Sequence, residues 1–267
     1  VENVKGLTRQ SFSEYYSYIK LRLTYPALRA KAGELWNAHL KRLRDYDAKG
    51  THRDLSYRVV DTVVNAADYG VPQHRHRVFL IGFRSDVIDG WNFPAPTHSG
   101  AALKAQQLSG EYFEHHSVSR KNRIIIKRAG GDAALKPWRT VRDAIHDMPV
   151  PKLEGVTGWL DHRLQLGAKT YPGHTGSPID APSKALKAGG HGVPGGENMI
   201  RFPDGSVRYY SIREAARIQT FPDDYALHGA WGEAMRQIGN AVPVELARVV
   251  AKSVVEHLEK DAADTLP

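Results

Sequence analysis

The sequence predicts an α/β protein that folds into about two compact units. A chain of 267 residues is longer than one typical small domain and shorter than three. Two apolar, β-branched runs, residues 57–64 and 77–83, are typical of buried strands. Helical periodicity precedes these runs and returns near the C-terminus. The presence of both patterns in one chain favours a mixed α/β fold.

The composition is that of a globular protein with an anionic partner. Hydrophobic residues make up 41% of the chain and charged residues 25%, which excludes a disordered or fibrous protein. The 37 Lys and Arg residues outnumber the 29 Asp and Glu residues, which leaves a formal net charge of +8. Such an excess is expected for a protein that binds a phosphate-rich partner. No apolar run approaches the roughly 20 residues of a bilayer-spanning helix, so we expect no membrane partner.

Cysteine is absent from the chain. This absence excludes disulfides and zinc ribbons, and it removes the thiol from the possible nucleophiles. The 13 histidines include adjacent pairs, but no set of His and carboxylate residues has the spacing of a recognised metal site. We therefore expect no bound metal.

The first part of the chain alternates helical and extended patterns. Residues 8–25 place apolar side chains on one helical face, and Pro26 ends that segment. Residues 30–49 have helical character. The strands at 57–64 and 77–83 follow, joined by a turn at Tyr69–Pro72.

From about Phe93 the composition changes to Pro, His, Ser and Gly, which indicates a linker. The region that follows is rich in Gly, His, Pro and short β-prone pieces, so we expect a second, irregular domain. It contains a cluster of basic residues with no acid among them: Arg120, Lys121, Arg123, Lys127 and Arg128.

Helical periodicity returns at Ser211. Ser211 and Glu214 have the spacing of a capping box, and Phe221-Pro222 ends this short helix. The final helix is predicted to start at Pro243, a favoured first-turn residue. Gly239-Asn240, before Pro243, is interpreted either as the entry into this helix or as exposed N–H groups that receive a carboxylate or phosphate of a ligand.

Two local clusters have both a functional and a purely structural interpretation. Gln73, Arg75 and Arg77 alternate, so they project to one side of an extended segment, which suits a base edge or a phosphate but is also typical of a solvated strand edge. Residues 190–195 match a dinucleotide-binding spacing, but no buried strand leads into them. This glycine-rich loop either lets the backbone approach DNA or is a plain surface loop.

Four segments, taken in order, resemble the C-terminal part of DNA (cytosine-5)-methyltransferases. They are Glu2-Asn3-Val4, residues 65–79 with their Gln73-x-Arg75-x-Arg77 pattern, residues 211–223, and residues 237–243. The resemblance covers residues 1 to about 97 and 207 to about 260. The region between these two stretches is identified only by its position in the chain.

The resemblance implies a domain organisation. Residues 1–97 would be the second half of a doubly wound, Rossmann-like methyltransferase domain. Residues 98–206 would be a smaller, irregular, β-rich target-recognition domain. Residues 207–267 would return to the catalytic domain and end in a helix. On its own, such a chain would leave the strands at 57–64 and 77–83 without sheet neighbours.

The resemblance also implies a reaction. Enzymes of this family add a cysteine thiolate to carbon 6 of a flipped cytosine, so that carbon 5 accepts a methyl group from S-adenosylmethionine. Glu2 would hold the ring nitrogen and the amine, and Arg77 would bind the ring carbonyl oxygen. Arg75 would brace the site or a neighbouring phosphate. Asn240 and Ala241 would lie beside the cofactor, which the N-terminal part of such an enzyme mainly binds.

Two partners follow from the resemblance: double-stranded DNA, and an N-terminal methyltransferase portion that carries a Pro-Cys motif. The location implied is the bacterial cytoplasm, associated with the nucleoid, in a restriction-modification system. The expected DNA contacts are Gln73, the five basic residues Arg120, Lys121, Arg123, Lys127 and Arg128, and the glycines Gly192, Gly195 and Gly196.

The chain departs from the family pattern because it has neither the Pro-Cys motif nor the Gly-containing cofactor motif. We therefore expect the chain alone to transfer no methyl groups. The start at Val1 favours a fragment of a single-chain enzyme over a subunit of a naturally split one. The alternative is a non-catalytic, sequence-specific DNA-binding protein derived from such an enzyme, and a third interpretation is an unrelated basic α/β protein.

Overall fold

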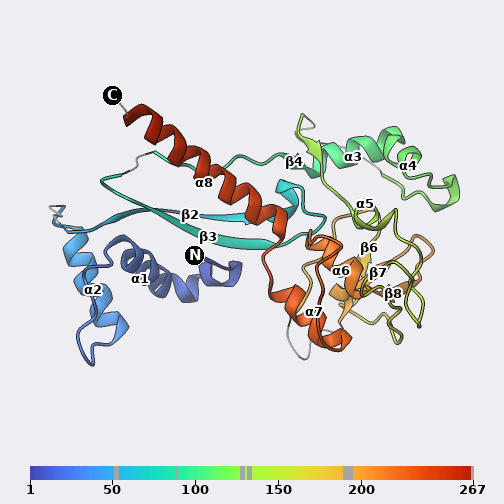
Figure 1. Ribbon diagram of the computed structural model, residues 1–267, viewed down its shortest axis with the longest axis horizontal. Helices are drawn as coiled ribbons and strands as arrows, with labels where there is room; N and C mark the ends of the chain where they lie inside the picture. Colours follow the sequence, from blue (N-terminus) through green and yellow to red (C-terminus); the bar gives the residue numbers. More distant parts are fainter. Residues whose placement is uncertain (51–53, 88–89, 127–129, 131–133, 189–194, 266–267) are drawn as a thin grey trace. The chain divides into compact units, whose positions relative to one another are not determined.

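A computed structural model describes residues 1–50, 54–87, 90–126, 130, 134–188 and 195–265, except for the side chains of residues 261–265. The chain divides into two compact units (Figure 1). Unit 1 comprises residues 1–64, 76–94 and 250–267, and unit 2 comprises residues 65–75 and 95–249. Helices and sheets occur in both, so the predicted α/β class is confirmed.

Unit 1 is built on a sheet of three strands: β1 (Glu2–Val4), β2 (Tyr57–Asn65) and β3 (His76–Arg84). The order is β1-β3-β2, so β3 lies in the centre. The strands predicted at 57–64 and 77–83 are thus confirmed, and each of their ends lies within one residue of the predicted one. The prediction that both of these strands lack sheet neighbours was wrong, because β3 pairs with β1 on one side and with β2 on the other.

The register of β1 against β3 positions two of the predicted catalytic residues. The strands are antiparallel, with Glu2 opposite Phe79 and Val4 opposite Arg77. Directly opposed side chains share one face of a sheet, and so do residues two apart on a strand. Glu2 and Arg77 therefore lie diagonally on the same face of the β1–β3 pair.

Helices accompany this sheet in unit 1. They are η1 (Lys5–Thr8), η2 (Gln10–Phe12), α1 (Ser13–Thr24), α2 (Trp36–Asp47) and the greater part of α8 (Val244–Thr265). Figure 1 shows α8 running along β2 and β3. Val254 of α8 packs against the buried Phe83 and Trp91, and Trp91 Nε1 donates to Ser253 Oγ at 3.2 Å.

Unit 2 combines short helices with very short strands. The helices are η3 (Ala66–Tyr69), α3 (Gly100–Ser109), α4 (Glu111–His115), η4 (Arg120–Asn122), α5 (Val141–Ile145), η5 (Gly196–Asn198), α6 (Ile212–Ile218) and α7 (Trp231–Asn240). The strands are β4 (His98–Ser99), β5 (Lys136–Pro137), β6 (Ser177–Pro178), β7 (Met199–Arg201) and β8 (Val207–Tyr209). β4 pairs in parallel with β5, and the other three form a sheet of order β6-β7-β8.

The core of unit 2 lies where α5, α6, α7 and β7 meet. Its fully buried side chains include Ile200, Tyr210, Ile218, Met235 and Ile238. These residues come from segments far apart in the sequence, so the core holds the C-terminal motifs against the middle of the chain.

The structure contains helices that the sequence patterns did not predict. α3, α4 and α5 lie in the region expected to be β-prone, and Ser99 begins α3 by accepting the N–H of Ala102 at 3.1 Å. Gly239-Asn240 was interpreted as the entry into the last helix. These two residues are instead the end of α7, and α8 begins separately at Val244.

The predicted capping box at the start of α6 is confirmed. Ser211 Oγ accepts from the Glu214 N–H at 3.1 Å, and a Glu214 carboxylate oxygen accepts from the Ser211 N–H at 2.9 Å. Ser211 Oγ also lies 2.8 Å from Nδ1 of the buried His162. The hydroxyl group of Ser211 thus caps α6 and also contacts a buried imidazole.

Replacement of Ser211 tests this arrangement. Ser211→Ala removes the cap and leaves the His162 nitrogen without this partner, so the free energy of unfolding should fall by about 1 to 2 kcal/mol. Ser119→Ala is the matched control, because Ser119 precedes η4 without a side-chain cap bond. Urea denaturation measures both, and equal stability of the two variants would contradict the role of the cap.

Candidate functional site

Glu2 and Arg77 form an ion pair on the β1–β3 sheet. Nε of Arg77 lies 2.7 Å from Oε1 of Glu2, and the two side chains are 13% and 26% exposed. Arg77 Nη1 also donates to the His76 carbonyl at 2.9 Å. The structure thus brings together two of the three residues predicted as catalytic.

The environment of this pair is partly shielded from water. Burial lowers the pKa of Arg77, while the charge of Glu2 and a hydrogen bond to it oppose that shift. An arginine still stays protonated at neutral pH, because its ordinary pKa is so high. The result is a cationic donor beside a carboxylate acceptor, in surroundings where both interact more strongly than in water.

Arg75, the third residue predicted as catalytic, is buried in unit 2 and binds backbone carbonyls. Its Nη2 donates to the carbonyl oxygens of Gly239 at 2.6 Å and Ala241 at 2.9 Å. Its Nη1 lies 3.4 Å from the Leu186 carbonyl oxygen. The first two carbonyls are at the C-terminal end of α7, where the helix dipole favours a cation. These contacts are those of a bracing residue.

Close packing at the same place accounts for Gly239. A Cβ at position 239 would lie 2.7 Å from the carbonyl carbon of Lys187 and 2.8 Å from the nitrogen of Ala188. A side chain would therefore force the backbone apart. Asn240 is exposed and Ala241 half-buried, so the two residues predicted to contact the cofactor follow directly on this packed turn.

Gln73, an expected DNA contact, is fully buried. The segment pairs with residue 183: the His74 N–H donates to the Ser183 carbonyl at 2.8 Å, and the Ser183 N–H donates to the Pro72 carbonyl at 2.9 Å. Neither amide atom of the Gln73 side chain has a hydrogen-bond partner within the described part of the chain. In this structure Gln73 is not open to DNA.

The basic cluster is only partly described. Arg120 and Lys121 are exposed on η4. Arg123 is half-buried: its Nε donates to the Val118 carbonyl at 3.1 Å, and its guanidinium lies 5.6 Å from the centre of the Phe113 ring. Arg123 therefore also stabilises its own segment. Lys127 and Arg128 lie outside the described residues.

The three glycines that were expected to contact DNA differ in what the structure shows of them. Gly192 lies outside the described residues, whereas Gly195 and Gly196 are buried. A Cβ at position 196 would lie 2.5 Å from Cα of His174, so packing within the protein requires this glycine. We do not retain Gly195 and Gly196 as DNA contacts, because their backbone is not accessible.

The sequence analysis missed a second buried arginine, Arg213 of α6. Its Nε donates to the Leu160 carbonyl at 3.0 Å, and its two Nη atoms donate to the carbonyls of Pro222 at 2.9 Å and Tyr225 at 2.8 Å. The available signal was an arginine in the first turn of a short, capped helix, directly after the apolar Ile212. Like Arg75, it holds loop backbone by its carbonyls.

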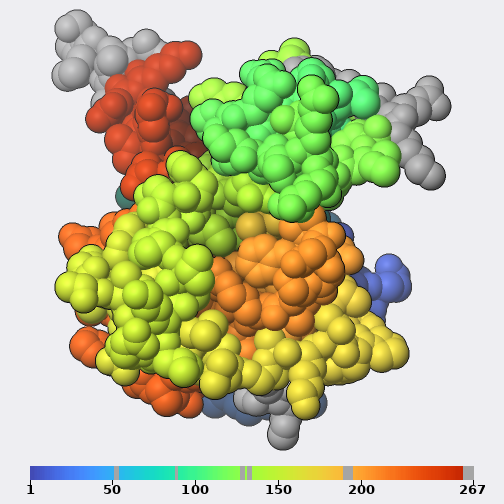
Figure 2. Space-filling view, turned by 90° about the vertical axis from the view of Figure 1, so that its right-hand side faces the viewer, coloured from blue at the N-terminus to red at the C-terminus, as the bar shows by residue number. Residues whose placement is uncertain are grey.

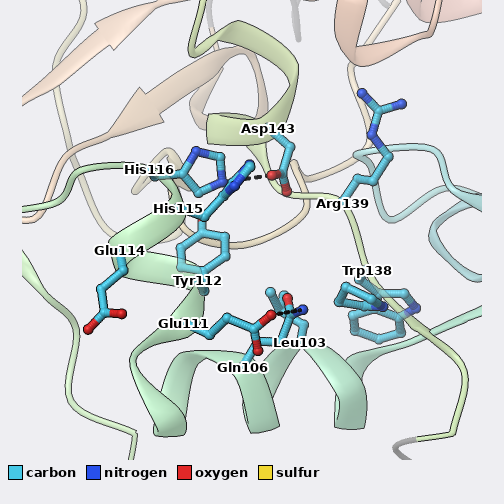
Figure 3. Close-up of a pocket in the computed structure, with 11 residues that line it drawn as sticks. Leu103, Gln106, Glu111, Tyr112, Glu114, His115, His116, Trp138, Arg139 and Asp143 are labelled. Atoms are coloured by element: carbon cyan, nitrogen blue, oxygen red, sulfur yellow. Dashed lines mark hydrogen bonds and ion pairs between the residues drawn. The ribbon is translucent and has the colours of Figure 1, made fainter.

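A cavity of about 540 Å³ lies in unit 2 between α3, α4 and residues 137–143. Figure 3 shows His115, His116 and Asp143 on one side and Leu103 and Trp138 on the other. His116 Nε2 lies 2.7 Å from Asp143 Oδ1, and Asp143 Oδ2 accepts from the Thr140 N–H at 2.6 Å. Asp143 thus joins α4 to the first turn of α5.

Opposing effects act on the Asp143 carboxyl. Burial raises its pKa, but hydrogen bonds from His116 and Thr140 outweigh that effect and hold the pKa below the ordinary value of 3.8. The carboxylate is therefore fixed in its charged form by structural partners. Its role in this cavity is to hold two helices, not to exchange protons near neutral pH.

Among the described residues, no group of three His, Asp or Glu side chains is placed to hold a metal ion. None of the described helices is long and apolar enough to cross a membrane.

Comparison with known proteins identifies the family. The family profile for "C-5 cytosine-specific DNA methylase" matches residues 46–256. The chain is 29% identical over 254 residues to the type II methyltransferase M.BspRI of Lysinibacillus sphaericus, covering 84% of this chain and 48% of the relative. It is 31% identical over 211 residues to M.MthTI of Methanothermobacter thermautotrophicus, covering 77% and 58%.

The chain spans about half the length of these curated relatives. Among solved structures, it resembles the S. pombe Dnmt2 methyltransferase with a TM-score of 0.44 and 14% identity, over 82% of this chain and 63% of that chain. This structural similarity is too low to add to the family assignment.

Replacement of Arg75 tests its bracing role. Arg75→Ala leaves two buried carbonyls without their charged donor, so the free energy of unfolding of unit 2 should fall by about 3 kcal/mol or more. Arg201→Ala, at an exposed arginine of unit 2, should change it by less than about 0.5 kcal/mol. Denaturant titration measures both, and an equally mild effect at Arg75 would argue against the clamp.

The depressed pKa of Asp143 predicts a pH dependence. Stability from this carboxylate is present above its unfolded-state pKa of 3.8 and is lost as the pH falls through the lower folded-state value. Asp143→Asn should therefore be less stable than the wild type at about pH 5, and the gap should narrow toward about pH 3. Asp224→Asn serves as the exposed control. A gap of constant size over this range would contradict the assignment.

Proposed function

Because the chain belongs to the C-5 cytosine-specific DNA methylase family, we propose that it is the C-terminal part, or a subunit, of a DNA (cytosine-5)-methyltransferase. The complete enzyme transfers a methyl group to carbon 5 of a cytosine within a specific DNA sequence. The observation that carries this proposal is the pairing of Glu2 with Arg77 at 2.7 Å, on adjacent strands.

The pair matches one edge of a cytosine ring. The ring carbonyl oxygen needs a donor, and the neighbouring ring nitrogen and exocyclic amine need a carboxyl group that can donate or accept. Because these positions are adjacent on the ring, their partners must be adjacent in the protein. The guanidinium of Arg77 and the carboxyl group of Glu2, which accepts when ionised and donates when protonated, meet that requirement. Each can exchange its present partner for the base.

The two residues also favour the addition step. When a thiolate adds to carbon 6, electron density moves into the ring and proton demand develops at the ring nitrogen. Glu2 would supply a proton or hydrogen bond there, and Arg77 would stabilise negative charge on the carbonyl oxygen. Because a duplex buries its bases, the cytosine must first swing out of the helix to reach them.

The donor methyl group comes from S-adenosylmethionine, mainly held by the N-terminal part of the enzyme. In this chain, Asn240 is the last residue of α7 and Ala241 follows it, and the exposed amide of Asn240 can donate and accept hydrogen bonds. The amide of Asn240 can therefore bind a polar group of this cofactor. Arg75 would fix the position of these residues through the carbonyls on either side of Asn240.

The reaction needs a partner, because this chain has no cysteine. We propose that an N-terminal methyltransferase portion with a Pro-Cys motif supplies the thiolate. β1 offers a place for it: β1 pairs with β3 on one side, and within the described residues no strand pairs with its other side. An unpaired strand edge is a ready template for a further strand.

Double-stranded DNA is the proposed substrate. Residues 98–206 would form the target-recognition domain, with Arg120 and Lys121 as exposed phosphate contacts and Arg123 as a residue that also stabilises its own segment. Lys127, Arg128 and Gly192 remain proposed contacts from the sequence alone. Type II relatives support a role in restriction-modification.

A methyl-transfer assay tests the proposal. Labelled methyl incorporation from S-adenosylmethionine into duplex DNA should be absent with this chain alone and present after addition of the N-terminal portion. In the reconstituted enzyme, Glu2→Gln should lower the rate by about 100-fold or more, because it removes the proton donor. DNA binding should persist.

Glu14→Gln is the matched control, since Glu14 is an exposed carboxylate of unit 1 paired with Arg44. It should leave the rate unchanged. Incorporation by the chain alone would contradict the need for an external thiolate. Salt-dependent DNA binding without incorporation in any combination would favour the non-catalytic DNA-binding protein instead.

A further inference from the structure

A short hairpin in unit 2 presents two stacked rings. Tyr171 and His174 exchange backbone hydrogen bonds: the His174 N–H donates to the Tyr171 carbonyl at 2.8 Å, and the Tyr171 N–H donates back at 3.3 Å. Pro172 and Gly173 form the turn between them. The two rings stack with centres 4.2 Å apart and planes 29° from parallel.

The inner ring of this stack is held in place by residues 196 and 197. Nδ1 of His174 accepts the Gly196 N–H at 3.1 Å, and a carboxylate oxygen of Glu197 lies 3.9 Å from the same nitrogen. The backbone of Gly196 packs so closely on His174 that a Cβ would lie 2.5 Å from its Cα. The hairpin thus has a rigid support, which lowers the entropy cost of using its outer ring for binding.

The outer ring is open to solvent. Tyr171 is 50% exposed, whereas the nearby Tyr209 is 7% exposed and packs against Trp231 at 5.0 Å. An aromatic ring with one side supported and the other exposed is the arrangement that proteins use to stack on nucleic-acid bases. Packing in the hydrophobic core therefore does not explain the aromatic side chain at position 171.

The surroundings of the hairpin are cationic. Lys184 Nζ donates to Thr175 Oγ1 at 3.2 Å, and Arg201 lies beside Gly176. Lys169 and Lys187 are exposed, and Lys187 pairs with Glu197 at 2.8 Å. Figure 2 shows the yellow surface of this segment on the outside of unit 2, next to the orange surface of β7 and β8. This charge complements a phosphate backbone.

We propose that Tyr171, supported by His174, stacks on a base of the bound DNA at an easily unstacked pyrimidine–purine step. The inference rests on the proposed DNA-binding function and adds a specificity-determining residue to it. Pyrimidine–purine steps open at the lowest cost, so a ring that inserts between or against bases selects for them without a base-edge hydrogen bond.

Selection from a pool of DNA duplexes with a randomised central segment tests the inference. The 267-residue chain should enrich sequences that share a TA, CA or TG step, and Tyr171→Ala should lose that enrichment. Affinity of Tyr171→Ala for the enriched duplex should fall by about 5- to 100-fold, the range measured for loss of base–aromatic stacking. The dependence of its affinity on salt should stay unchanged, because no phosphate contact is removed.

Two variants separate stacking from other effects. Tyr171→Phe keeps the ring and should retain both the enrichment and the affinity. Tyr225→Ala is the matched control: Tyr225 is 49% exposed in the same unit and packs against Phe221 at 4.9 Å, but its neighbours include Asp223 and Asp224. It should behave as the wild type.

Each contrary result has a distinct meaning. Wild-type enrichment and affinity in Tyr171→Ala would overturn the inference and leave the proposed function intact. A loss in Tyr171→Phe equal to that in Tyr171→Ala would also overturn it, because the hydroxyl group would then carry the contact. Absence of salt-dependent binding by the wild type would overturn the proposed DNA binding and this inference together.

Discussion

The buried guanidinium of Arg75 is the interaction on which the organisation of unit 2 depends. A charged group without water is costly unless it is hydrogen-bonded, and Nη2 of Arg75 donates to the carbonyls of Gly239 and Ala241. The segment before β3 is thereby tied to the end of α7. Two motifs more than 150 residues apart in the sequence thus become one structural element. Gly239 completes the contact, because its missing side chain lets α7 approach the backbone of Lys187 and Ala188. Asn240 is therefore held in place, because the carbonyls of the residues before and after it are both bound.

The alternating residues 73, 75 and 77 do three different things, although their spacing suggests one shared surface. Gln73 is buried beside the backbone of Ser183, Arg75 clamps carbonyls, and Arg77 pairs with Glu2. The reason lies in the chain path, because the boundary between the two compact units falls between Arg75 and residue 76. Alternation places residues on one side of a strand only while the strand stays in one sheet. Here the strand begins at residue 76, so only Arg77 obeys the pattern of β3.

Local signals in the sequence predicted the elements that depend on local interactions. The capping box of Ser211 and Glu214 needs only four consecutive residues, and it gave the start of α6 correctly. The strands β2 and β3 were found from their apolar, β-branched runs. The cap of α3 at Ser99 was present too, but it lay in a segment rich in Pro and Gly that is also typical of a linker. A local sequence pattern does not show which distant residue a side chain contacts in the folded chain. The burial of Arg213 and the contact of Gly196 with residue 174 both depend on such partners.

The net charge of the chain includes cations that lie inside the fold. A formal charge of +8 indicates a polyanionic partner, but several arginines direct their charge inward. Arg75 binds backbone carbonyls, and Arg213 binds carbonyls and pairs with Asp161 at 3.7 Å. Arg208 pairs with the buried Glu214 at 2.6 Å. These cations hold the fold and are not available to phosphate. In the proposed complex with DNA, attraction must therefore come from exposed groups such as Lys121. Since phosphate contacts carry no sequence information, selectivity requires other chemistry on the same surface. An exposed aromatic ring on a rigid hairpin supplies a contact that depends on how easily the bases separate, which is a property of the sequence itself.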